Sequence, residues 1–319
     1  MSKQSGAAKK SIFKDQRVLL GIVIIAIIAV VSFINPKFIA VKNMITILQQ
    51  ISVTGILTMA MSILLIGGGV DLSIGNLMVL SGVSMAELIS LGYSVPIAVL
   101  AGMAVGIAGG LLNGVIIARS KCIPLIITLG TSQVFYGLAL TVSGGRIMSF
   151  DGAFNFIGKT KLGGVFPVML FVLAIVIVIS YIVMNYTKFG RRLTCIGGNE
   201  KTAFLSGINV VRYKAIMYGI AGFYCAIAAI VFSSRIDSIT ANAGSGYETN
   251  ALTAAIIGGV TFDGGKGTIT GAFLGCILMG VISNAMNILK VETYVQTIIT
   301  GVIIVCAVVL SNYNNIKRS

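Results

Sequence analysis

The sequence contains no histidine and no tryptophan, and only 10% of its residues are charged. Without histidine, a Ser-His-Asp triad, an HExxH protease site and the usual zinc sites are excluded, and nine carboxylates remain for acid-base chemistry. The five cysteines are scattered and form no CxxC pair, so we interpret them as free thiols that fill small apolar spaces. This composition leaves little room for an enzyme.

Charged residues are scarce because the chain is apolar. Hydrophobic residues make up 56% of its 319 residues, and the mean hydropathy is +1.01. Soluble domains average about 25% charged residues. The composition therefore predicts a membrane protein with no second globular domain.

Apolar runs of helical length predict an all-α integral membrane protein with about ten transmembrane helices, some of them broken or short. The runs lie at 18–34, 44–66, 73–91, 95–118, 122–142, 165–184, 213–232, 250–260, 268–289 and 294–311. The eighth run is too short for an ordinary span, so we expect a half-helix, a tilted broken helix or an earlier start. We expect one transmembrane domain over 18–311, between a cytoplasmic segment 1–17 and a cytoplasmic tail 312–319.

The net charge of +14 follows the predicted topology. Ten spans place both termini on one side of the membrane. If that side is the cytoplasm, lysine and arginine divide 16 inside to 7 outside, as the positive-inside rule requires. The basic character therefore indicates orientation, and we expect no nucleic-acid partner.

Glycine is frequent, and two stripes of it recur at helical spacing. They are Gly102, Gly106, Gly110 and Gly114 in the fourth run, and Gly267, Gly271 and Gly275 in the ninth. In lipid, such stripes let helix backbones approach closely. We expect tight helix packing at both stripes.

Two further glycine clusters interrupt the apolar runs. The first holds Gly68, Gly69, Asp71 and Ser73, and the second holds Gly258, Gly259, Gly264 and Gly265. Asp71 or Ser73 can cap the helix that follows. Broken helices in both halves of a transporter mark substrate paths and moving parts, although plain capped turns explain the clusters equally well. Neither cluster is a phosphate loop, because Val260 and Gly267 occupy the positions that would need Gly and Ser or Thr.

The longest hydrophilic stretch on the predicted cytoplasmic side is 185–212. Within it, residues 199–206 can form about two helical turns with Asn199 as the cap. Ala203, Phe204 and Leu205 would form a small apolar knob on this helix. With no packing partner in the chain, it is suited to dock into a groove on another protein. The expected contact residues are Asn199, Glu200, Lys201, Ala203, Phe204, Leu205, Ser206 and Gly207.

Four blocks, in this order and spacing, resemble the permease subunits of ribose-type ABC importers, a family similar to the branched-chain amino acid permeases. The blocks are GGVDLSIG at 68–75, the segment 190–210, AGSGYE at 243–248, and IGG at 257–259 with GGKG at 264–267. The order of the four blocks is more specific than any one glycine run. Residues 261–263, Thr-Phe-Asp, depart from the family's pattern, which casts doubt on a role for the Asp263 side chain.

The resemblance implies a type II ABC importer-like permease that forms a homodimer in the bacterial inner membrane. Cytoplasmic ABC ATPases, fused in tandem or as two copies, would bind ATP and Mg, so this chain would hold no cofactor and catalyse no reaction. Residues 199–208 would be the coupling helix that fits the ATPase. An extracytoplasmic sugar-binding protein would dock on the outer loops 143–164 and 233–249. The implied solute is ribose or another monosaccharide, with furanosides, polyols and nucleosides as alternatives, and membrane lipid is a further partner.

Polar side chains inside the predicted spans are candidates for the solute path. They are Gln49, Gln50, Asn76, Glu87, Asn113, Gln133, Asn284, Asn287 and Gln296. Each is also explained as an interhelical hydrogen bond. Glu87 is a stronger candidate because an ionisable group in a span is costly unless paired or wetted, although it lies near the outer end of its run.

A secondary transporter or channel that works without an ATPase is the alternative. It would explain the broken helices, but acidic residues for proton or sodium coupling are scarce and a docking helix would have no use. An intramembrane enzyme is disfavoured, because the chain has no histidine, no paired acidic motif and no GxSxG nucleophile.

Overall fold

The computed structural model describes residues 16–120, 122–164 and 166–316. Most of the predicted segment 1–17 and the end of the predicted tail 312–319 therefore lie outside the described residues. The described chain is nearly all helical. Its strands are two antiparallel pairs of two residues each, β1 (Met148–Ser149) with β4 (Ser238–Ile239), and β2 (Lys161–Leu162) with β3 (Phe166–Pro167).

Every predicted apolar run contains a helix. The helices are α2 (Gln16–Ile34), α3 (Val41–Ile66), α4 (Ile74–Ser90), α5 (Val95–Ser120), α6 (Pro124–Ser143), α8 (Val168–Tyr186), α11 (Val210–Ile236), α12 (Tyr247–Ile257), α13 (Ile269–Ile288) and α14 (Thr293–Ile316). Seven described helices are long and apolar enough to cross a membrane by themselves. The other three are α4, α12 and α14, of which α4 and residues 293–309 of α14 form shorter apolar helices. The all-α membrane class is confirmed, with seven such helices where ten spans are predicted.

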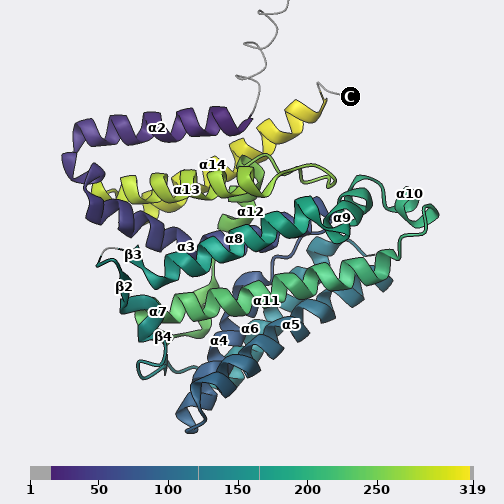
Figure 1. Ribbon diagram of the computed structural model, residues 1–319, viewed down its shortest axis with the longest axis horizontal. Helices are drawn as coiled ribbons and strands as arrows, with labels where there is room; N and C mark the ends of the chain where they lie inside the picture. Colours follow the sequence, from purple (N-terminus) through teal and green to yellow (C-terminus); the bar gives the residue numbers. More distant parts are fainter. Residues whose placement is uncertain (1–15, 121, 165, 317–319) are drawn as a thin grey trace, which may run out of the picture.

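The long helices run side by side between two ends of the molecule (Figure 1). One end carries α9 (Lys188–Gly198) and α10 (Glu200–Leu205), and we call it the α10 end. The other carries α7 (Asn155–Lys159) and the short strands, and we call it the α7 end. Helix α2, the first described helix, begins on the side of the α10 end. Helix α14, the last described helix, ends on the same side (Figure 1).

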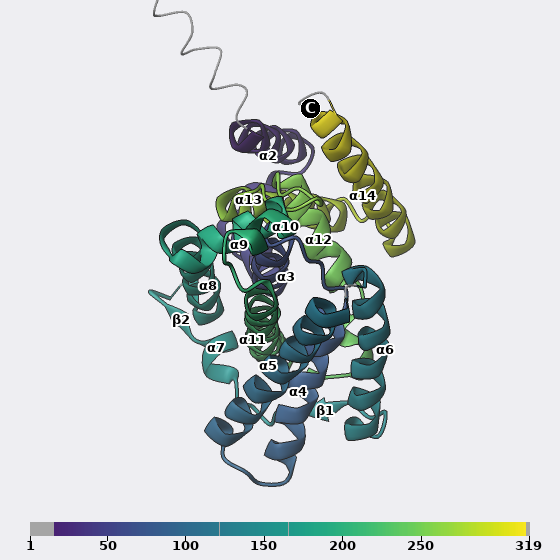
Figure 2. The same cartoon turned by 90° about the vertical axis from the view of Figure 1, so that its right-hand side faces the viewer.

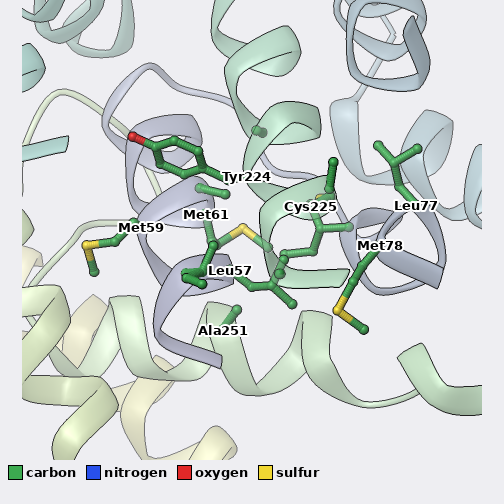
Figure 3. Close-up of a cluster of buried hydrophobic side chains, with 14 of the residues drawn as sticks. Leu57, Met59, Met61, Leu77, Met78, Tyr224, Cys225 and Ala251 are labelled. Carbon is green, nitrogen blue, oxygen red and sulfur yellow. The ribbon is translucent and has the colours of Figure 1, made fainter. Parts of the chain in front are cut away.

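Helices α3 and α11 form the centre of the bundle, and the other helices surround them (Figure 2). In their most apolar stretches, 78% of the α3 residues and 72% of the α11 residues are buried, against 17% for α2 and 28% for α5. Figure 3 shows the centre, where Met61 of α3, Met78 of α4 and Cys225 of α11 share one buried cluster. The outer helices expose large apolar side chains, as a lipid-facing surface requires.

The glycine stripe of α5 packs against α11, as its spacing predicts. A Cβ atom on Gly110 would clash with the carbonyl group of Tyr218, and one on Gly114 would lie 2.8 Å from the Cα atom of Ala215. The prediction for the ninth run is correct only in part. Gly275 packs against Ala254 of α12 and Gly271 against Gly258 directly after α12, but Gly267 lies in the break before α13, with φ +144°. It is therefore not part of a helical stripe.

The eighth span consists of a short helix and an extended lead-in. Helix α12 has 11 residues, and β4 and the 3₁₀ turn η2 (Ala241–Gly244) come before it. This lead-in runs antiparallel to α4, with Ile239 against Gly82 and Gly244 against Gly75. Irregular backbone is tolerated at membrane depth where it is buried in protein, and Ile239 is 1% exposed. Within the predicted outer loop 233–249, Ile239, Ala241 and Gly244 are therefore buried and cannot themselves receive a partner, whereas Asn242 is exposed.

Candidate functional site

A polar cavity of about 290 Å³ lies between α3, α12, α13 and α14. Its residues come from the last turn of α11, the start of α12 and the second half of α13, which place it toward the α7 end. The hydrogen-bonding side chains that line it are Gln50, Thr54, Arg235, Tyr247, Asn250, Ser283, Asn287 and Thr300. The volume is at the lower end of the usual range for small-molecule sites, roughly 300 to 1,000 Å³.

The cavity lining suits a neutral solute that carries several hydroxyl groups. Apart from Arg235, every polar group that lines the cavity is uncharged. The Oε1 atom of Gln50, a residue of this lining, is buried and has no hydrogen-bond partner among the described residues, so a rotation of the side chain would offer a free acceptor to the cavity. The Oδ1 atom of Asn287 accepts a 3.0 Å bond from Gln296, which leaves its amide hydrogens for a solute.

Of the predicted path residues, Gln50 and Asn287 line this cavity, and Gln296 contacts Asn287. Others form hydrogen bonds between helices instead. Asn76 of α4 donates to the Ser132 hydroxyl of α6 at 2.8 Å, and Asn284 of α13 accepts from Asn43 of α3 at 2.9 Å. For these residues the structure supports a packing role.

The remaining four candidates do not line the cavity, and one of them, Asn113, belongs instead to the Asp71 cluster described below. Gln133 is exposed on α6, Glu87 is half-buried near the end of α4, and Gln49 is half-buried on α3 without lining the cavity. The sequence did not indicate Arg235, Tyr247, Asn250, Ser283 or Thr300 as lining residues. Tyr247 stands in the AGSGYE block, which is the one signal that could have pointed to this region.

Asp71 lies in the first helix break, 67–73, in a buried hydrogen-bond cluster. Its Oδ1 atom accepts from the backbone N–H of Ser73 at 2.7 Å and from the Ser73 hydroxyl at 2.5 Å. Asn113 of α5 donates to the other carboxylate oxygen at 3.2 Å and to the Ser73 hydroxyl at 2.9 Å. Of the two residues predicted to cap α4, Ser73 makes no side-chain cap, and Asp71 accepts a backbone N–H at the helix start. The hydrogen bonds from Asn113 therefore attach the first helix break to α5.

A glycine junction joins both helix breaks to α9 at the α10 end. The breaks are 67–73 and 258–268, and they contain the predicted residues Gly68, Gly69, Gly258, Gly259, Gly264 and Gly265. The N–H of Gly265 donates to the carbonyl of Ile66 at 2.9 Å. A Cβ on Gly68 would lie 3.1 Å from the Cα of Gly197, and one on Gly264 would lie 2.9 Å from the Cα of Gly68. Three segments far apart in the sequence therefore meet backbone to backbone.

Helix α10 follows this junction and protrudes from the bundle (Figure 1). The Asn199 side chain caps it by accepting the N–H of Thr202 at 2.9 Å, as predicted. Phe204 and Leu205 are 68% and 76% exposed. Ala203 is 3% exposed, so its placement in the exposed knob is wrong: it lies on the face of the helix that packs on the chain.

Of the other predicted contact residues, Glu200 forms a 2.5 Å ion pair with Lys214 of α11, which fixes α10 to the bundle. Lys201, Ser206 and Gly207 are exposed. The α10 surface therefore offers two exposed apolar side chains among polar ones, which suits a groove on another protein.

Comparison with known proteins places the chain in a family. The family described as "Branched-chain amino acid transport system / permease component" matches residues 43–308. The chain is 35% identical over 294 residues to the ribose import permease protein RbsC of Bacillus subtilis (strain 168). The aligned region covers 91% of this chain and 90% of that protein. It is 34% identical over 314 residues to the L-arabinose transport system permease protein AraH of Escherichia coli (strain K12), with 97% and 95% covered. It is 35% identical over 289 residues to the D-allose transport system permease protein AlsC of Escherichia coli (strain K12), with 89% and 88% covered. No solved structure matches the chain.

The chain therefore belongs to this permease family, whose members are the membrane subunits of ABC transporters. It is a multi-pass, non-catalytic permease of an ABC importer, and ATP hydrolysis lies in a partner ATPase. A substrate-binding protein is the other partner that the family implies. The resemblance predicted from the four sequence blocks is confirmed.

Proposed function

We propose that this chain forms the path for a monosaccharide through the bacterial inner membrane, as a homodimer driven by a cytoplasmic ABC ATPase. The cavity beside α12 is the observation that carries the proposal. A sugar presents several hydroxyl groups and no charge, and the cavity offers donors and acceptors in place of acidic groups. The relatives are named for ribose, L-arabinose and D-allose, which supports the same class of solute.

The proposed orientation places the α10 end in the cytoplasm. Lysine and arginine divide 16 to 7 in favour of the predicted inner side, and described residues of that side, among them Arg191, Lys201 and Lys214, belong to the helices at this end. The first and last described helices also begin and end there (Figure 1). In this orientation the exposed Phe204 and Leu205 of α10 face the ATPase, which binds ATP and Mg, while this chain holds no cofactor.

The opposite end receives the sugar-binding protein. Of the two predicted outer loops, 143–164 offers the larger free surface, since Ile147 is 72% and Phe156 is 68% exposed. Asp237 at the end of α11 accepts the Gly152 N–H at 3.0 Å and so ties this loop to the bundle. Delivery from this side brings the sugar to the end of the molecule where the cavity lies.

Transport in this proposal is alternating access driven from the α10 end. Closure of the ATPase moves α10, and the glycine junction passes that motion to both helix breaks. The helices beyond the breaks, α4 and α13, then change their packing, and α13 lines the cavity. Weak hydrogen bonds suit such a path, because the binding protein supplies the selectivity and the path must release the sugar.

Reconstitution tests this function. The chain, its ATPase and its binding protein are placed in proteoliposomes, and the uptake of radiolabelled ribose, L-arabinose and D-allose is followed with and without ATP. We expect ATP-dependent accumulation of one of these sugars that also requires the binding protein. Uptake by the chain alone, driven by an ion gradient, would instead establish the secondary-transport alternative.

A further inference from the structure

A second cavity, of about 370 Å³, lies at the α10 end and has no role in the function proposed above. It is lined by residues of α9, of the turn that joins α10 to α11, and of the first two turns of α11. These residues are Phe189, Arg192, Gly207, Ile208, Asn209, Arg212, Tyr213 and Ile216. The cavity thus lies beside the turn through which the chain passes from α10 to α11.

One wall of this cavity carries two arginines without an acidic partner. The Arg192 guanidinium donates to the Tyr213 hydroxyl and lies 5.5 Å from the centre of its ring. Neither Arg192 nor Arg212 forms an ion pair with any carboxylate among the described residues. Two guanidinium groups at one cavity favour an anion with several oxygen atoms, and a phosphate group matches their geometry.

The other wall is apolar. The Phe189 ring stacks on the Tyr213 ring with centroids 5.5 Å apart, and Ile208 and Ile216 complete this wall. Tyrosine is typical of the boundary between membrane and water. A free phosphate ion would use only the arginine wall, whereas a phospholipid would use both, its headgroup at the arginines and its chains along the apolar side. Basic pockets between helices on the cytoplasmic side are known headgroup sites.

We propose that this cavity binds the phosphate headgroup of an anionic phospholipid from the cytoplasmic leaflet. The proposal takes from the function above only the orientation of the molecule. The bound lipid bridges α9 and α11 through Arg192 and Arg212, and so holds the 207–209 turn from which α10 extends. Anionic lipid then sets the position in which α10 meets its partner.

Lipid binding by the purified chain tests this directly. A short-chain phosphatidylglycerol is titrated onto the detergent-solubilised protein and bound lipid is counted by native mass spectrometry, with phosphatidylcholine as the neutral comparison. The test variant is Arg192→Ala with Arg212→Ala. The control is Lys188→Ala with Arg191→Ala, which removes the same charge from exposed positions of α9 that do not line the cavity. We expect the test variant to lose affinity for phosphatidylglycerol about tenfold or more, and the control to change little.

Three results would overturn the proposal. Equal loss in both variants would show diffuse attraction to charge, and competition by inorganic phosphate at the same concentration would show a free-anion site. Unchanged lipid affinity together with loss of the co-purifying ATPase would assign the arginines to the protein interface.

Thermal unfolding checks the fold of each variant. If the double variant is unstable, the single change Arg212→Ala, at an exposed residue, replaces it. Because no transport is measured, failure of this test leaves the proposed sugar path standing, and failure of sugar uptake leaves this test valid.

Discussion

The backbone N–H of Gly265 donates a 2.9 Å hydrogen bond to the carbonyl oxygen of Ile66 and so connects the two helix breaks of the chain. Ile66 is the last residue of α3, and Gly265 lies in the loop before α13. Gly197, at the end of α9, lies against both. Displacement of α9 must therefore move backbone in both halves of the bundle, because no flexible side chain lies between them to absorb it.

A methyl group at Gly197 should open this junction. The added Cβ would lie 2.6 Å from the Gly265 nitrogen and 3.0 Å from the Gly68 nitrogen, and backbone atoms cannot rotate away as a side chain can. We expect Gly197→Ala to lower ATP-driven uptake in proteoliposomes, because overpacking, which typically costs about 1 to 3 kcal/mol of stability, forces the three backbone segments apart. Gly198→Ala is the matched control, because a Cβ there meets no atom within 4 Å. Equal uptake by the two variants would mean that the junction carries no motion.

Much of the fold follows from patterns along the sequence. The apolar runs predicted every long helix. The four-residue spacing of Gly106, Gly110 and Gly114 predicted the close approach of α5 to another helix. The cap at Asn199 was also predictable, because a side chain that accepts a nearby backbone N–H depends only on local sequence. These features share one property: the residues that make them lie within a few turns of each other.

The features that sequence reasoning missed depend on contacts between distant segments. Ile66, Gly197 and Gly265 belong to three parts of the chain, and nothing in the glycine spacing shows that they meet. The cavity likewise collects Gln50, Arg235 and Asn250 from different helices. Ala203 shows a second limit, since two helical turns give too little periodicity to tell which face will be buried.

Substitutions in the cavity separate a solute path from a packing role. Asn250→Ala and Asn287→Ala each remove a group that lines the cavity, so we expect each to lower the sugar uptake rate roughly fivefold, as the loss of about 1 kcal/mol of hydrogen bonding implies. Gln133→Ala removes an equally polar group that is exposed on α6, and uptake should stay near the unmodified rate. The measurement is initial uptake at low sugar concentration with saturating binding protein. An effect at Gln133 that matches the other two would place the path along α6 instead.

Contact with the ATPase should depend on Leu205. This side chain is 76% exposed in the isolated chain, so Leu205→Asp leaves the fold intact but places a charge where α10 meets an apolar groove. We expect the solubilised variant to lose its co-purifying ATPase in a pull-down while keeping its thermal stability. Leu205→Met, which conserves apolar volume, should retain the ATPase. An ATPase that stays bound to Leu205→Asp would move the interface away from this residue.

Removal of the Asn113 amide should destabilise the first helix break. Among the described residues, Asn113 is the one donor to the Oδ2 atom of Asp71, and both residues are fully buried. Asn113→Ala leaves that oxygen unpaired, which costs about 1 to 3 kcal/mol and more if the group is charged. We expect a clear fall in the Tm of the detergent-solubilised protein. The control is Asn185→Ala, an exposed asparagine whose side chain bonds only the Tyr181 carbonyl of its own helix, and its Tm should hardly change.

The contact between α5 and α11 should tolerate no side chain at Gly110. A Cβ there would lie 2.9 Å from the carbonyl carbon of Tyr218 and 3.1 Å from the Cα of Gly222, so Gly110→Leu must push two backbones apart. In lipid, close backbone packing is itself the attraction between helices, and no hydrophobic effect compensates for its loss. We expect Gly110→Leu to lower both the Tm and the yield of folded protein. Gly130→Leu on α6 should fold normally, because a Cβ at Gly130 meets nothing within 4 Å. If both variants fold equally well, the glycine stripe is not what holds these two helices together.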